Sequence, residues 1–285
     1  KLFRVCAMRH IPIFTFINKM DREARDPFDL LDELESEFGI GTYPMNWPIS
    51  CGVNFKGVYD RSKKAIVTFD DAHRGRERLR GIECDITNIE KLDELIGPYR
   101  REELVEQVEL LDGACFDFDL DKVRNGTLSP VFFGSALNNF GIELFLESFL
   151  KMTTSPLPRK TGDTVVDPFD EGFSAFVFKI QANMNKAHRD RIAFMRICSG
   201  KFEKDTEYKH VQGGKNIRLS QPQQMMAATR EAITEAYAGD IIGVFDPGIF
   251  SIGDTICDKK MNIEFEGIPT FAPERFAIVE QIDSM

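Results

Sequence analysis

Two segments of the chain share one order of hydrophobic and polar positions. The first is an apolar run at residues 13–17, followed by Asn-Lys-Met-Asp at 18–21 and then by apolar residues at helical spacing. The second is an apolar run at 128–133, followed by Gly-Ser-Ala-Leu at 134–137 and a helical pattern from Ile142. Short, continuously apolar runs are typical of parallel strands that are buried on both faces. Each segment therefore predicts a strand, a loop and a helix.

Residues at the expected ends of elements support these assignments. Asp26 precedes Pro27, which is the order of an N-cap and a first helical residue, and Gly39 is suited to end that helix. Strand-like residues at 57–59 and 65–69 flank a polar turn and predict a hairpin.

The pattern changes after Met152. Short strand-like runs separated by turn signals occur at 173–181, 191–199, 206–211, 216–219, 241–244 and 255–257. This alternation predicts a small antiparallel barrel. We expect a first domain at 1–153, a linker at 154–171, the barrel at 172–262 and the start of a third domain at 263–285.

Composition restricts the classes of function. The net charge of 36 − 46 = −10 over 285 residues disfavours broad nonspecific binding to nucleic acid, so any RNA contact must be local. No apolar run is long enough to span a bilayer and no signal-peptide layout is visible, which predicts a cytoplasmic protein. The six cysteines lie at least 31 residues apart, so zinc-site spacing is absent and we expect no metal site.

The loop at 18–21 has a form suited to reading guanine. The N1–H and the exocyclic amine of guanine are adjacent donors, and the carboxylate of Asp21 could accept from both. Adenine lacks this pair and would leave the carboxylate without partners, at a cost of roughly 1.5–3 kcal/mol per lost bond. The stem of Lys19 could lie along the purine face, and Asn18 could tie the loop to neighbouring backbone.

The second loop, Ser135, Ala136 and Leu137, would complete the pocket. A backbone N–H would reach guanine O6, and the hydroxyl of Ser135 would brace Asp21. The alternative is that Asn18 and Asp21 are ordinary loop or cap residues and that Ser135 is a turn residue. The pattern alone leaves the two interpretations evenly matched.

Longer segments resemble the bacterial peptide chain release factor 3 family of translational GTPases over nearly the whole chain. They are 18–27 (NKMDREARDP), 43–49 (YPMNWPI), 56–59 (KGVY), 130–137 (PVFFGSAL), 188–192 (HRDRI) and 268–276 (IPTFAPERF). Elongation factor G is similar at 18–21 but differs at 23–27. The resemblance implies the C-terminal part of a P-loop GTPase domain with an inserted α+β subdomain at about 42–126. An all-β barrel like the second domain of elongation factor Tu would follow.

The resemblance also implies a function in translation termination. The intact protein would bind and hydrolyse GTP with Mg²⁺, bind the ribosome and drive off class I release factors, without DNA or a membrane as partner. Alternatives are an elongation factor G-like or ribosome-protection GTPase and, in another class, a non-catalytic module that binds the ribosome or RNA.

The phosphate-binding motif of this family is missing from the sequence. The pairs Gly200-Lys201 and Gly214-Lys215 have Met195 and Lys209 where a P-loop needs its first glycine. Residues 240–243 fit Asp-x-x-Gly but are read as a turn. We therefore expect a fragment that lacks the upstream P-loop region and most of the third domain, has no catalytic residue and is inactive by itself.

Basic residues of the predicted barrel are candidates for facing the ribosome. They are Lys186, His188, Arg189 and Arg191. A solvated charged face is an equally weighted alternative. For the arginines at 74, 76, 78 and 80 in the insert, the solvated face is favoured.

Overall fold

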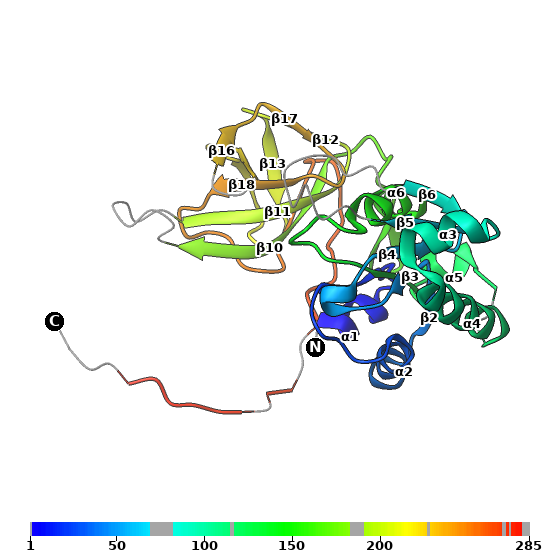
Figure 1. Ribbon diagram of the computed structural model, residues 1–285. Coiled ribbons are helices and arrows are strands. Elements are labelled where there is room, and N and C mark those ends of the chain that lie inside the picture. Colours follow the sequence, from blue (N-terminus) through cyan, green and yellow to red (C-terminus); the bar gives the residue numbers. More distant parts are fainter. Residues whose placement is uncertain are drawn as a thin grey trace. The chain divides into compact units, whose positions relative to one another are not determined.

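A computed structural model describes residues 2–68, 82–114, 117–182, 191–226, 229–269, 272–273 and 275–280. The chain divides into two compact units, residues 1–153 and 154–285 (Figure 1). Each unit has a hydrophobic core made of its own residues.

The first unit contains a parallel sheet in which β7 (Leu128–Phe133) lies between β1 (Thr15–Ile17) and β2 (Gly41–Pro44). Every residue of β7 is buried, as its apolar run predicts. The same prediction is wrong for β1, which is only half-buried because it is an edge strand of the described sheet. Residue 42, where the sequence predicted the insert to begin, lies inside β2.

Among the described residues, four helices accompany this parallel sheet. They are α1 (Leu2–Met8), α2 (Pro27–Phe38), α5 (Leu120–Arg124) and α6 (Ile142–Met152). The predicted ends of α2 are confirmed: the side chain of Asp26 accepts a hydrogen bond from the Phe28 N–H, and Gly39 takes the left-handed conformation with φ 64°. A glycine adopts this conformation without the clash that a Cβ would cause.

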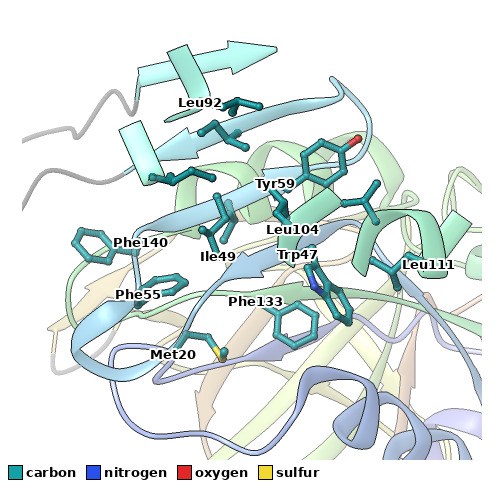
Figure 2. Packing of buried hydrophobic residues seen from close by; sticks show 14 of the residues in the cluster. Met20, Trp47, Ile49, Phe55, Tyr59, Leu92, Leu104, Leu111, Phe133 and Phe140 are labelled. Atoms are coloured by element: carbon teal, nitrogen blue, oxygen red, sulfur yellow. The ribbon is translucent and has the colours of Figure 1, made fainter. Parts of the chain in front are cut away.

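Between β2 and α5 the chain leaves the parallel sheet and forms what we call the inserted subdomain. It consists of β3 (Asn46–Ile49), the short helix η1 (Gly52–Asn54), β4 (Gly57–Asp60), β5 (Ala65–Thr68), β6 (Ile82–Asp85), α3 (Ile89–Ile96) and α4 (Pro98–Ala114). The four strands form an antiparallel sheet in chain order, and the predicted hairpin is β4–β5. Aromatic and aliphatic side chains from the strands and both helices fill one core (Figure 2).

The second unit contains an antiparallel sheet of eight described strands. In spatial order they are β14 (Lys215–Arg218), β13 (Glu207–His210), β19 (Thr255–Cys257), β10 (Ser174–Ala182), β11 (Arg191–Ser199), β18 (Ile241–Phe245), β15 (Gln223–Met226) and β16 (Thr229–Ala232). A separate ribbon pairs β12 (Lys201–Glu203) with β17 (Glu235–Tyr237). All six predicted runs are strands of this sheet, and their alternate residues form the core.

The segment predicted as a linker contains a hairpin of its own, β8 (Arg159–Thr161) with β9 (Thr164–Val166). The guanidinium carbon of Arg159 lies 3.7 Å from the ring centre of Phe176 and 5.0 Å from that of Phe265. Stacking of a guanidinium on aromatic rings stabilises this arrangement. The hairpin was not predicted because the Pro, Ser and Thr residues around it are typical of a linker.

Candidate nucleotide-base site

The two loops predicted to form a site are joined by backbone hydrogen bonds. The Met20 N–H donates to the Gly134 carbonyl at 3.0 Å, and the Gly134 N–H donates to the Ile17 carbonyl at 3.0 Å. They meet because β1 and β7 are parallel neighbours, so that their carboxyl ends lie at one edge of the sheet.

Asn18 links the loops through its side chain. Its Oδ1 accepts from the Lys19 N–H at 2.7 Å and from the Ala136 N–H at 2.8 Å, across 118 positions of sequence. Lys19 takes a positive φ of 70°, so the chain turns sharply at this point. One amide oxygen thus links the two predicted recognition segments directly.

Ser135 is fully buried, and its backbone N–H and carbonyl both pair with Phe140, which closes the second loop. Its hydroxyl accepts from the Nδ2 of Asn138 at 3.2 Å. The expected brace, in which this hydroxyl donates to Asp21, does not occur among the described contacts, and the bond from Asn138 uses only an acceptor site of the hydroxyl.

The remaining predicted residues are wholly or partly exposed to solvent. Asp21 is half-buried, and within the described part of the chain its carboxylate has no hydrogen bond or ion pair. Lys19 and Leu137 are exposed, Leu137 to 77%. The Leu137 N–H also has no protein acceptor among the described residues, whereas the Ala136 N–H is taken by Asn18. An acceptor and a donor of the protein therefore remain available beside the joined loops.

Sequence reasoning missed two supporting residues. Met20 occupies the free position of the Asn-Lys-x-Asp pattern, yet it is 1% exposed and belongs to the core of the first unit. Gly52, at the start of η1, donates its N–H to the carbonyls of Met20 at 2.9 Å and Arg22 at 3.1 Å. The apolar character of Met20 within a polar loop was the signal that could have indicated an anchor.

The predicted ribosome-facing group is described only at its last member. Lys186, His188 and Arg189 lie outside the described residues, as do the arginines of the insert. The Nε of Arg191 lies 2.6 Å from the Oδ2 of the buried Asp246, and its Nη2 donates to the Phe250 carbonyl at 3.2 Å. These contacts hold Arg191 against the loop after β18.

Two other motifs considered from the sequence, at Gly200-Lys201 and at residues 240–243, lie at turns between strands. Gly200, with φ 65°, forms the turn between β11 and β12. The carboxylate of Asp240 accepts from the Tyr237 N–H at 2.9 Å, so residues 240–243 follow a turn and enter β18.

In the described part of the chain, no three His, Cys, Asp or Glu side chains are grouped to hold a metal ion. No described helix is long and apolar enough to cross a membrane.

Comparison with known proteins agrees with this division of the chain. Residues 1–155 match the family model of the elongation factor Tu GTP binding domain, and residues 172–259 match that of elongation factor G domain 2.

Among curated proteins, the chain is 56% identical over 285 residues to peptide chain release factor 3 of Symbiobacterium thermophilum, covering 100% of this chain and 54% of that protein. It is 50% identical over 277 residues to the protein of the same name from Gloeobacter violaceus, covering 97% and 52%. For Gloeothece citriformis the identity is 49% over 280 residues, with 98% and 52% covered. The chain thus spans about half the length of these relatives.

Proposed function

Since the chain belongs to the family of the elongation factor Tu GTP binding domain, we propose that it is part of a translation termination factor. The whole protein would be a GTPase that binds the ribosome and promotes the release of class I release factors. The names of its relatives, which are peptide chain release factors, support termination over elongation or ribosome protection.

The observation that carries the proposal is the bond from the Ala136 N–H to Asn18 Oδ1 at 2.8 Å. It joins the two loops of the guanine-recognition pattern while leaving the Asp21 carboxylate available. We assign Asp21 to the N1–H and N2 amine of guanine, and the stem of Lys19 to the purine face. Of the backbone N–H groups of the second loop, we assign that of Leu137 as the donor to guanine O6, because the Ala136 N–H is engaged by Asn18.

GTP or GDP would be held with Mg²⁺, which in phosphoryl transfer neutralises charge on the phosphates. In this chain the residues Asn18, Lys19, Asp21 and 135–137 would orient the base. The sequence holds no P-loop motif, and we assign no residue to phosphate binding or to water activation. We infer that residues 1–285 do not hydrolyse GTP by themselves and that hydrolysis belongs to a longer protein.

The ribosome and class I release factors would be the partners in the cytoplasm. We keep Lys186, His188 and Arg189 as the residues that face ribosomal RNA, since arginine and lysine pair with phosphate. Arg191 would support these residues by its contact with Asp246 in the loop after β18, in addition to any contact with RNA.

Substitution of Asp21 tests the proposal in the longer protein. In Asp21→Asn the amide would accept from N1–H and donate to the C2 carbonyl of xanthine, so we expect preference to shift from GTP toward XTP by about tenfold to a hundredfold. Competition binding of the two nucleotides measures it. The matched control is Asp32→Asn, which changes an exposed carboxylate on α2. An unchanged preference for GTP in Asp21→Asn would reject the assignment.

A further inference from the structure

Both loops of the candidate base site are held by the inserted subdomain. Asn46 of β3 contacts the strand that leads into the second loop, and Gly52 of η1 contacts the first loop. The two contacts come from residues only six positions apart, whereas Asn18 and Ser135 are separated by most of the first unit. A single short segment, residues 46–52, therefore contacts both halves of the candidate site.

Asn46 pairs with both backbone polar groups of one residue, Phe133. Its Nδ2 donates to the Phe133 carbonyl at 3.0 Å, and its Oδ1 accepts from the Phe133 N–H at 2.7 Å. The side chain is 0% exposed, and Phe133 is the last residue of β7, directly before Gly134. Removal of the amide would leave a buried donor and acceptor without partners, which is strongly unfavourable. The end of β7 is thus fixed to the inserted subdomain.

Gly52 fixes the other loop by its backbone. Its N–H is shared between the carbonyls of Met20 and Arg22, and its φ of 64° requires a left-handed conformation. A Cβ at this position would lie 2.7 Å from the Oε1 of Glu23. An alanine would therefore strain the left-handed turn that holds the loop containing Asp21, and the end of the Glu23 side chain would have to move aside.

The hydrophobic core also joins the two loops to the inserted subdomain. Met20 and Phe140 from the two loops, and Phe133 at the end of β7, share one cluster with residues of the inserted subdomain that include Trp47 and Phe55. Figure 2 shows Met20 beneath Phe55 and Phe133 beside Trp47. A displacement of β3 or η1 would be passed to the loops because closely packed interiors deform little.

We propose that Asn46 and Gly52 are positioning residues for base recognition, through which the inserted subdomain sets the distance between the two loops and thereby controls nucleotide selectivity. This inference rests on the proposed function. A ligand or partner that shifts the inserted subdomain would then alter guanine binding without touching the nucleotide.

The test compares GDP with inosine diphosphate in the longer protein. Inosine keeps N1–H but lacks the exocyclic amine, so the ratio of the two dissociation constants reports on the reach of Asp21. In Asn46→Ala and Gly52→Ala we expect the ratio of inosine diphosphate to GDP constants to fall about threefold to tenfold, because a misplaced carboxylate loses part of one charge-assisted bond.

Leu92→Ala is the matched control. Leu92 is fully buried in α3, in the same core, and Figure 2 shows it well away from Met20. This variant destabilises the inserted subdomain but leaves both contacts in place, so its ratio should equal that of the wild type. Fluorescence of Trp47 shows in each variant that the core is folded.

Two results would overturn the inference. One is an unchanged ratio in both folded variants, and the other is an equal fall in Leu92→Ala, which would show a general effect of stability. The Asp21→Asn experiment separates these results from failure of the proposed function: a shift toward XTP there, with no effect at Asn46 or Gly52, would reject the positioning role alone.

Discussion

At the scale of single residues, the candidate site depends on Gly134, because glycine has no Cβ. A Cβ built on Gly134 would lie 2.3 Å from the Phe140 carbonyl oxygen and 2.8 Å from the ring of Phe16. The backbone of the second loop can therefore close against Phe140 only if residue 134 has no side chain. Sequence reasoning placed Gly134 at the loop but had no means to detect this close approach.

Gly134→Ala should therefore destabilise the first unit. We expect the free energy of unfolding to fall by about 1–3 kcal/mol, because the extra methyl group overpacks a closed contact with backbone. Urea unfolding followed by Trp47 fluorescence measures it. The same substitution at Gly113, an exposed position of α4 with no atom near its Cβ, should be neutral or slightly stabilising. Equal stability of the two variants would contradict the role given to Gly134.

At the scale of elements, agreement was good where the sequence carries its own end signals. Helix α2 begins and ends where Asp26 and Gly39 predict, and β7 is buried throughout. The strands β12, β15, β16 and β17 were not predicted, since their polar and charged residues conceal the alternation. Their pairing depends on neighbours that are distant in sequence.

An exposed group of charged side chains lies on the ribbon of β12 and β17. The ammonium group of Lys201 lies 2.8 Å from Glu235 and 3.2 Å from Glu203. The hydrogen bond from Lys201 lowers the pKa of the Glu235 carboxyl below its usual value of 4.5, and Glu235 raises that of Lys201. A lowered carboxyl pKa adds stability above the unfolded pKa, and this is lost as the pH falls through the folded value.

Glu235→Gln should thus lower the thermal midpoint of the second unit at pH 7, by a small amount because the pair is exposed. As the pH falls from 7 to below the lowered pKa of the Glu235 carboxyl, the midpoints of the variant and the wild type should converge. Circular dichroism across this pH range is the measurement, with Glu231→Gln on β16 as the exposed control. A deficit that persists at low pH would indicate that the charge is not the cause.

At the scale of the whole molecule, the two units have separate cores. The cluster of the first unit and the larger cluster of the second share no residue. Trp47 is the single tryptophan of the chain and is fully buried in the first unit. Its fluorescence therefore follows only the unit with the candidate site.

Phe202→Ala should separate the two unfolding transitions. The ring is fully buried in the second unit, and its removal costs about 3–5 kcal/mol in a packed core. We expect the β-sheet signal in circular dichroism to show an earlier transition, with no change in the midpoint of Trp47 fluorescence. In Leu92→Ala we expect the midpoint of Trp47 fluorescence to fall and the transition of the second unit in circular dichroism to stay unchanged. A Trp47 midpoint that falls in Phe202→Ala would show that the units unfold together.

The sequence by itself determined the elements whose periodicity and caps are local, the division into an α/β part and an all-β part, and the residue types that suit a guanine edge. Only the tertiary structure decided that Asn18 bonds Ala136 and that Asn46 and Gly52 hold both loops. The physical reason is that these contacts join residues distant in sequence through backbone groups, which every residue type carries and which therefore leave no pattern in the sequence.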